Sequence, residues 1–584
     1  MRRPTRRLAV ALAAALLPAL AACGVGMPTH GDVVTAGPAP QATRVPGISI
    51  DPRPPQRGAS PTEIVQGFLD AMLATPTQTR SAQQFLTQGA RTSWDPGHAT
   101  LVYGEKGVPR GASADVSIDL ANAYRLDSRG AWLGRVPAAG RRLSFRLAQE
   151  DGEWRIASAP NALIVPVSWY EARFVQLSLY FFDPSGRVLV PEPVFVPRGN
   201  QLATTLVRDL VAGPPPELTG VARSFLPPGV GEGLSVPVSA DGTADIALTS
   251  GPDEPGQQTA QALTLLTAQL GWTLRQDPTV TSIRLSIGGR VIQLPGGRSR
   301  FSVSDGPEYD PAGYQTSAQM FGLDDHGRLV SGQPPHLMPV AGPFGARAVG
   351  LRAVAVDLDG ERAAGVTTDG TEIRVSPVRN GSTVRTVATG ADLLRPAWDV
   401  AGRLWVVDRT VGGARVSYVD SGGNRHPLQV PGVSGSDVVR FLVSRDGSRL
   451  IAVRRDDAGD RVVVSRLRSD DLGVVTSATA AVQISPEETA PMRIKDVGWS
   501  SPTTLLLLHR LSGVTQLRPI SVDGSSAAFP DQPIVVADSV DALLSSPVSD
   551  QGAYGVFGTQ MRGLTGDSRD SVLDGPVTSL GFVG

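Results

Sequence analysis

Six short segments of the chain share one pattern, a tight turn of the Asp/Ser-Gly type followed by an apolar strand. The turn favours glycine because it needs a residue that tolerates positive φ. After a first gap of about 33 residues, the turns recur about every 42 to 54 residues, the length of one four-stranded propeller blade. We therefore predict an all-β propeller of five to seven blades over residues 320–584. The segments are GLDDHGRLVSG (322–332), AVDLDGERAAGVTTDG (355–370), AWDVAGRLWVVD (397–408), VSRDGSRLIAVRR (443–455), GWSSPTTLLLLHR (498–510) and VSDQGAYGVFG (548–558).

Three tryptophans, Trp398, Trp405 and Trp499, lie beside these turns. Large aromatic side chains at such positions are expected to pack between blades. The alternative is that they face a ligand at one end of the propeller.

Two of the turns carry several carboxylates. DDHG holds Asp324 and Asp325, and DLDGER holds Asp357 and Asp359. Both partly resemble calcium loops but lack the third ligand and the later glutamate. We interpret them as blade turns and predict no metal site.

The N-terminus is typical of an exported protein. Four arginines in MRRPTRR precede an apolar run from Leu8 to Leu17, about half the length that spans a bilayer. The segment LAAC then ends at Cys23, the one cysteine of the chain, so an intrachain disulfide is impossible. LAAC resembles the bacterial lipobox, which implies a lipoprotein signal peptide over residues 1–22 and a diacylglycerol on Cys23. A plain signal peptide with an incidental cysteine is the alternative, and the choice between general and twin-arginine export stays open.

Residues 23–60 are rich in proline and glycine and are predicted to form a flexible spacer after the lipidated cysteine. No later segment is long and apolar enough to span a membrane. We expect the chain to lie on the extracytoplasmic side of the cell membrane, attached by its lipid.

The region 61–165 shows helical periodicity first and strand alternation afterwards. PTEIVQGFLDAMLA places apolar residues at helical spacing, and SAQQFLTQGA is a second short helix. Val116, Ile118 and Leu120 alternate with polar residues, as do neighbouring residues of 143–147. This order predicts an α+β domain with two helices on an antiparallel sheet. We expect it to serve as an interaction or spacer module.

The next region pairs strands around the turn DPSG and then alternates helices with strands. Its segments LVAGPP, SFLPPGVGEGLSV, ADGTADIAL and LTLLTAQLGWTLRQDPTVTSIRLSIGG resemble the GerMN domain. The resemblance covers residues 174–297 and implies a second α+β module of a cell-envelope protein, with no catalytic residue to transfer.

Catalytic motifs are missing from the sequence. The chain has no HExxH, G-x-S-x-G, S-x-x-K or P-loop segment, and a net charge of −1 gives no reason to expect nucleic acid as a partner. The histidines are scattered, so we predict no catalytic residue, no metal and no cofactor; they are His30, His98, His326, His336, His426 and His509.

The order of these parts resembles the LpqB family of actinobacterial lipoproteins, which is associated with the MtrA–MtrB two-component system. The resemblance implies a non-enzymatic accessory protein that contacts the extracytoplasmic domain of the sensor kinase MtrB and affects cell division and cell-wall homeostasis. A lipoprotein that senses cell-wall fragments or a solute is the first alternative. An envelope hydrolase acting through the propeller face is the second.

Overall fold

The computed structural model describes residues 52–584, except 75–78, 112, 227–233, 250–258, 295–296, 314–317, 487–490, 526–532, 537–539, 541, 549–550 and 566–567. The described residues belong to one compact unit, residues 51–584. The predicted signal peptide, Cys23 and most of the predicted spacer lie outside the described residues.

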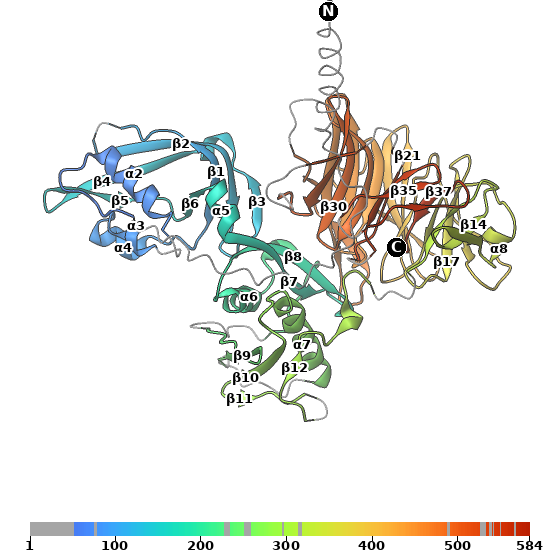
Figure 1. The fold of residues 1–584 in the computed structure, drawn as a ribbon, viewed down its shortest axis with the longest axis horizontal. Coiled ribbons are helices and arrows are strands. Elements are labelled where there is room, and N and C mark those ends of the chain that lie inside the picture. The colour runs from blue at the N-terminus through green and yellow to red at the C-terminus, as the bar shows by residue number, and fades with distance from the viewer. Residues whose placement is uncertain are drawn as a thin grey trace, which may run out of the picture. The chain divides into compact units, whose positions relative to one another are not determined.

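The first domain is a mixed sheet with helices packed on it (Figure 1). Its sheet order is β5-β4-β2-β1-β6, with β3 paired to β2. The α+β prediction is confirmed, but β6 pairs parallel with β1, so the sheet is not purely antiparallel. The elements are α2 (Pro61–Ala71), α3 (Arg80–Gln83), α4 (Gln88–Ser93), β1 (Thr100–Lys106), β2 (Asp115–Leu126), β3 (Trp132–Arg135), β4 (Arg142–Glu150), β5 (Glu153–Ser158), β6 (Leu163–Pro166) and α5 (Val167–Arg173).

Helix α2 starts as its sequence predicts. The Ser60 side chain accepts from the Glu63 N–H, the Glu63 carboxylate accepts from the Ser60 N–H, and Pro61 occupies the first turn. These contacts satisfy backbone donors that the helix itself leaves open. The apolar stripe of α2 is buried against the sheet, where the predicted inward positions of β2 are also buried.

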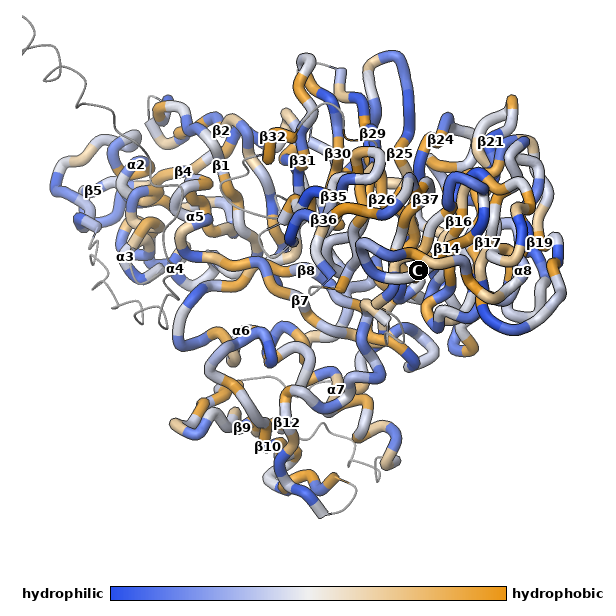
Figure 2. The backbone as a smooth tube through the Cα atoms, turned by 45° about the vertical axis from the view of Figure 1, so that its right-hand side comes forward, coloured by the Kyte–Doolittle hydropathy of each residue, from blue (hydrophilic) through white to orange (hydrophobic). Residues whose placement is uncertain are grey.

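The second module begins with a long two-stranded hairpin, β7 (Phe174–Phe182) and β8 (Leu189–Pro197), much of it apolar (Figure 2). Asp183 and Gly186 close its turn through a 2.9 Å backbone hydrogen bond, as predicted from DPSG. The hairpin packs on α6 and α7. The other elements are α6 (Leu202–Val211), β9 (Thr243–Leu248), α7 (Ala260–Leu274), β10 (Ser282–Ile287), β11 (Arg290–Val291) and β12 (Phe301–Ser302).

The C-terminal region forms six sheets in the part of the chain that the structure describes. Five follow in chain order. They are β16 (Leu351–Val356), β17 (Arg362–Thr367), β18 (Glu372–Pro377) and β19 (Arg385–Thr389); β20 (Ala397–Trp398), β21 (Leu404–Thr410), β22 (Gly413–Val419) and β23 (Arg425–Leu428); β24 (Val438–Val443), β25 (Arg449–Asp456), β26 (Gly459–Ser469), β27 (Val475–Ala478) and β28 (Val482–Gln483); β29 (Arg493–Ser501), β30 (Thr504–Leu511), β31 (Val514–Ser521) and β32 (Ile534–Val536); and β33 (Ala542–Ser545), β34 (Ala553–Phe557), β35 (Gln560–Gly563) and β36 (Ser571–Val572).

The sixth sheet joins the two ends of this region. Strand β37 (Thr578–Gly581) pairs with β13 (Met320–Leu323), which continues to β14 (Leu329–Gln333) and β15 (His336–Pro339). The first strands of neighbouring sheets contact one another in sequence, and β33 contacts β37, which in turn contacts β16. The six sheets therefore close into a propeller with a ring of inner strands.

The blade turns share a side-chain arrangement that the repeat did not reveal. Asp324 accepts from the backbone and side chain of Arg328, and Asp399 accepts from Arg403 in the same way. Asp399 also accepts from the Trp405 indole N–H at 2.8 Å. Trp398, Trp405 and Trp499 are all buried and pack against residues of neighbouring blades, as predicted, and Trp499 also lines the central cavity of the propeller.

A buried carboxylate at the boundary of the first two modules makes stability depend on pH. Asp209 of α6 is 5% exposed, and burial raises its pKa to about 6. A raised pKa means that the folded state binds the proton more tightly than the unfolded state. The contribution of Asp209 to stability therefore falls as pH rises from about 4 to 6 and stays low above that.

We expect Asp209→Asn to raise the free energy of unfolding at pH 7 by up to about 3 kcal/mol and to change it little near pH 4. Urea unfolding of the variant and the natural protein at both pH values measures this difference. Asp359→Asn, at an exposed turn position, is the control. A variant with unchanged or lower stability at pH 7 would contradict the assignment.

Candidate functional site

A cavity of about 570 Å³ lies at the centre of the propeller. Residues of all six inner strands, or of the segments that lead into them, line it. Its charged side chains are five arginines and two aspartates, which gives the described lining an excess of three positive charges. They are Arg352, Arg395, Arg409, Arg440, Arg445, Asp392 and Asp496.

These charges lie at two levels. Arg352 is the second residue of β16, Arg440 is the third residue of β24, and Arg395 comes just before β20. Because repeated blades run their inner strands in the same direction, these arginines share one end of the channel. Arg445 follows the end of β24 and lies at the opposite end.

Arg395 and Arg440 lie around one carboxylate, that of Asp496 on β29. Arg440 Nε is 3.8 Å from Asp496 Oδ1, which is longer than a hydrogen bond. Asp496 accepts instead from the N–H of Leu543 at 3.0 Å and from its neighbour Val497. Desolvation raises the pKa of Asp496, which means that burial disfavours its negative charge.

The Arg395 side chain is exposed, and the water that it meets is that of the channel, inside the ring of blades. Its Nη1 donates to the Leu580 carbonyl at 3.3 Å. Desolvation lowers the pKa of Arg395, and the like charge of Arg440 acts in the same direction. Gly581 leaves the room that this guanidinium occupies, because a Cβ there would lie 2.1 Å from Nη2.

The other mouth residues form a closed ion-pair group. Asp392 accepts from Arg352 through one carboxylate oxygen and from Arg409 through the other, and Arg352 also donates to the Leu393 carbonyl. Both arginines of this group hydrogen-bond directly to its one carboxylate, so the group keeps one excess positive charge but few unused donors toward Asp392. Arg395 and Arg440 are therefore the cations at the mouth with the fewest partners among the described residues.

The far end of the channel is held by Arg445, which is 5% exposed. It donates to the carbonyls of Ala312 and Val583 and lies 3.4 Å from Ser546 Oγ. Burial lowers the pKa of Arg445 to about 10, so the side chain remains charged at neutral pH. Arg445 therefore hydrogen-bonds both to the segment that precedes β13 and to the segment that follows β37.

A second buried charge cluster joins the GerMN-type module to the propeller. Glu192 of β8 accepts two hydrogen bonds from Arg466, at 2.8 and 2.7 Å, and one from Arg449 at 2.8 Å. Arg449 is fully buried and also donates to the Pro191 carbonyl. Desolvation, followed by the like charge of Arg466, lowers the pKa of Arg449. We call Glu192, Arg449 and Arg466 the ionic junction.

Hydrogen bonds between uncharged groups also join the GerMN-type module to the propeller. Gln176 of β7 donates to Ser521 Oγ at 3.0 Å and to Ser525 Oγ at 2.9 Å. The Ser469 N–H donates to the Gly220 carbonyl at 2.7 Å. Arg449 follows the turn after β24, so the ionic junction lies at the end of the propeller opposite to the channel mouth.

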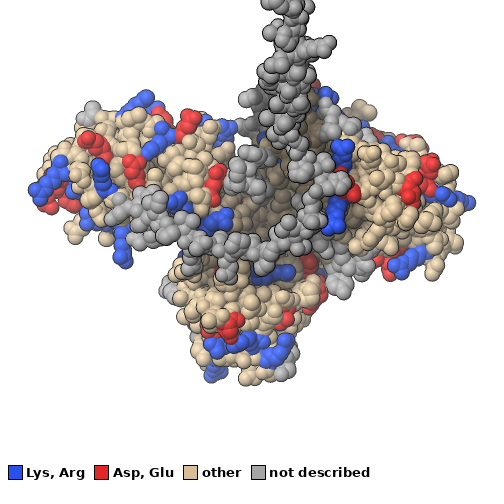
Figure 3. All heavy atoms as spheres, viewed as in Figure 1, with Lys and Arg blue, Asp and Glu red and all other residues tan. Residues whose placement is uncertain are grey.

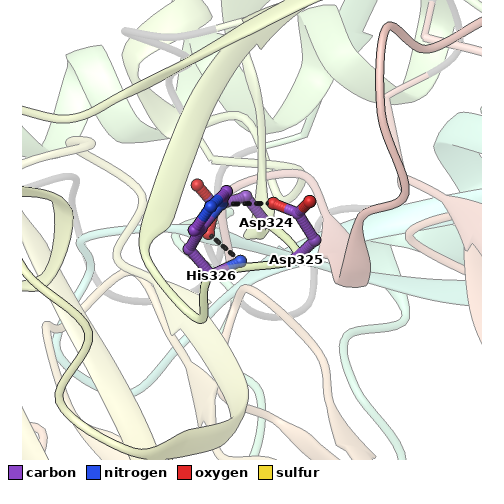
Figure 4. A group of neighbouring side chains, drawn as sticks. All are labelled: Asp324, Asp325 and His326. Carbon is purple, nitrogen blue, oxygen red and sulfur yellow. Dashed lines mark hydrogen bonds and ion pairs between the residues drawn. The ribbon is translucent and has the colours of Figure 1, made fainter.

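The acidic turn singled out in the sequence gathers three possible metal-ligand atoms within 4.8 Å of one another, from Asp324, Asp325 and His326 (Figure 4). The carboxylate of Asp324, however, already accepts from the N–H groups of His326 and Arg328. Asp325 and His326 are exposed and pair with each other. DDHG lies in the turn between β13 and β14, as predicted for a blade turn.

Positive and negative side chains are interspersed on the face shown in Figure 3. Among the described residues, no helix is long and apolar enough to cross a bilayer. The predicted lipidation site, Cys23, lies outside the described part of the chain.

Sequence reasoning missed both charge clusters. Glu192 is the lone charge in the apolar strand LVPEPVFVP, and Arg440 is the lone charge in VVRFLV. A single charged residue in a buried strand is a usable signal, because such a group needs a partner. The partners come from distant parts of the sequence, so only the fold identifies them.

The fold and these sites define a class of protein with an N-terminal α+β domain, a GerMN-type module and a six-bladed propeller. Residues 54–171 match the lipoprotein LpqB N-terminal domain, and residues 327–549 match the lipoprotein LpqB beta-propeller domain. Residues 178–293 match the family described as sporulation and spore germination. The chain belongs to the LpqB lipoprotein family, and the predicted family and fold class are confirmed.

The relatives cover most of the chain. Lipoprotein LpqB of Streptomyces coelicolor is 27% identical over 90% of this chain and 89% of its own length. The protein of the same name from Cutibacterium acnes is 27% identical over 93% of both chains, and that of Mycolicibacterium paratuberculosis is 29% identical over 76% of this chain and 72% of its own.

Similar solved structures include TolB from Acinetobacter baumannii, with a TM-score of 0.31 and 11% identity over 57% of this chain and 88% of that one. The first GerMN domain of the sporulation protein GerM from Bacillus subtilis has a TM-score of 0.18 and 24% identity, over 22% of this chain and 94% of its own.

Proposed function

We propose that the protein is a lipid-anchored, extracytoplasmic and non-enzymatic accessory protein of the sensor kinase MtrB. In this role it contacts the external domain of the kinase, modulates signalling to MtrA, and thereby affects cell division and cell-wall homeostasis. Its relatives are named lipoproteins, and the LAAC segment at Cys23 supplies the attachment site.

The observation that carries the proposal is the buried ionic junction. It fixes the GerMN-type module to the propeller, so loops of both modules are presented in a fixed geometry. A preorganised surface loses less entropy on binding than one assembled from mobile parts. Attachment beside another membrane protein also raises the effective concentration, so a weak contact suffices.

The channel carboxylates favour this role over a hydrolase. Asp392 is saturated by two arginines, and Asp496 accepts from backbone N–H groups. Neither is placed as a free acid and base pair of the kind that glycoside cleavage uses.

Co-purification tests the proposed contact. The full chain in detergent should retain the external domain of MtrB, and saturable binding in the micromolar range is expected. A chain that lacks the propeller tests which module is needed. Absence of binding with the external domain at about 100-fold higher concentration would argue strongly against the role.

A sensor of a small ligand is the second candidate, and it is compatible with the first. The arginine-rich channel favours it, because cavities of about 300–1,000 Å³ with a few convergent polar groups commonly hold ligands. A ligand bound there would give the accessory protein a signal to transmit.

A further inference from the structure

We propose that the propeller channel binds a small molecule bearing a carboxylate or phosphate, whose oxygens are held between Arg395 and Arg440. This inference builds on the sensor role and does not depend on the kinase contact. It also assigns the chemistry of the ligand and the residues that recognise it.

Arg395 and Arg440 have most of their hydrogen-bond donors unused among the described residues. A guanidinium carries five N–H donors in a planar fork that matches an oxyanion. Within the described residues, Arg395 donates one hydrogen bond, to the Leu580 carbonyl, and Arg440 donates one, to the Val439 carbonyl. Most donors of both groups therefore remain free for a ligand.

The charges around Asp496 also favour a bound anion. Arg395 and Arg440 share the single carboxylate of Asp496, which leaves one uncompensated positive charge at this point of the channel. Two like charges in a protein-enclosed space repel each other, and a bound anion relieves that repulsion. The group Arg352–Asp392–Arg409 at the same mouth also carries one excess positive charge, but both of its arginines donate directly to the carboxylate, whereas Arg440 Nε stays 3.8 Å from Asp496.

Apolar side chains lie between the arginines of the mouth and Arg445 at the far end. Phe441, Val443 and Phe582 line the channel beyond Arg440 and are buried, and Leu543 and Leu580 are buried at the level of Arg440. The cavity volume of about 570 Å³ suits a small molecule. The ligand class is therefore a compact body with one oxyanion at its outer end.

Two sources share this chemistry, a phosphate ester and the free carboxylate of a peptide. Inorganic phosphate and the dipeptide N-acetyl-D-alanyl-D-alanine serve as the two probes. Each is titrated into the full chain in detergent, at constant ionic strength and pH 7, and followed by calorimetry. Saturable binding of either probe is expected, and the probe that saturates identifies the source.

Four variants test the residues. Arg395→Gln and Arg440→Gln should each lower the affinity for the probe that binds by about 10-fold or more, because charged hydrogen bonds are among the strongest in proteins. Asp496→Asn should strengthen binding, since it removes the competing carboxylate. Arg461→Gln removes one positive charge on the exposed face of β26 and should change the affinity less than about 2-fold.

Arg440 is half exposed, so its variant is expected to fold even if Arg395→Gln does not. Failure of both probes to saturate would overturn the proposal. An equal loss of affinity in Arg461→Gln and Arg440→Gln would also overturn the proposal, because the effect would then depend only on the net charge of the protein. The kinase co-purification is a separate experiment, so failure of either leaves the other standing.

Discussion

Replacing Glu192 with alanine is expected to lower the free energy of unfolding of the propeller and its attached module by about 3–5 kcal/mol. The carboxylate accepts three hydrogen bonds from Arg449 and Arg466. Without it, Arg449 and Arg466 lose the carboxylate that they share, and Arg449 keeps the buried Asp446 carboxylate at 3.5 Å. Their desolvation cost remains while the compensating attraction is lost.

Urea unfolding followed by tryptophan fluorescence measures this change, because Trp398 and Trp405 are buried in the propeller. Glu217→Ala, at an exposed position of the same module, is the matched control and should stay within about 0.5 kcal/mol of the natural protein. A Glu192→Ala variant as stable as this control would contradict the assigned role of the ionic junction.

A combined variant separates charge from packing. Glu192→Leu together with Arg449→Met and Arg466→Met removes the three charges of the ionic junction and keeps apolar volume, and Asp446→Asn removes the buried carboxylate that pairs with Arg449 at 3.5 Å. Buried ion pairs replaced in this way are often as stable as the original. We therefore expect this variant to recover most of the stability lost in Glu192→Ala. No recovery would indicate that the loss comes from shape and not from unpaired charge.

The second large effect concerns the membrane. Cys23→Ala is expected to move nearly all of the protein from the membrane fraction to the soluble fraction, with its domains still folded. Stable membrane attachment takes two or more acyl chains. The diacylglycerol on the Cys23 thiol would supply them, so removing the thiol removes the anchor. Fractionation with immunodetection measures the distribution, and mass spectrometry measures the mass of the N-terminal peptide.

His30→Ala, seven residues downstream in the predicted spacer, is the control and should remain with the membrane. A Cys23→Ala protein that stays membrane-bound with normal processing would contradict lipid attachment at this residue. Circular dichroism of the released protein, matching that of the natural chain, shows that release is not a consequence of unfolding.

The repetitive part of the fold was predictable from sequence. Five of the six blade turns hold a glycine at positive φ, and the turn between β29 and β30 is made by Pro502 and Thr503 without one. An apolar strand follows each turn, so the six segments reveal the propeller without any long-range information. The alternation of Val116, Ile118 and Leu120 likewise identifies β2, and all three side chains are buried. The physical cause of each of these patterns lies within a few neighbouring residues, so a short stretch of sequence is enough to predict the element.

The pairing of distant charges was not predictable. Glu192 and its partner Arg466 are 274 residues apart, and Arg395 and Asp496 come from different blades. Neither the parallel pairing of β6 with β1 nor the aspartate–arginine caps of the turns follows from periodicity alone. Such features depend on which segments the fold brings together.

Reconstitution of the kinase tests the central proposal most directly. MtrB in liposomes, with and without the lipidated full chain, is assayed for the rate of phosphate transfer to MtrA. We predict that the natural chain changes this rate several-fold and that an equal total concentration of Cys23→Ala has a much smaller effect. An unchanged rate, with the natural chain verified in the same liposomes, would contradict the account.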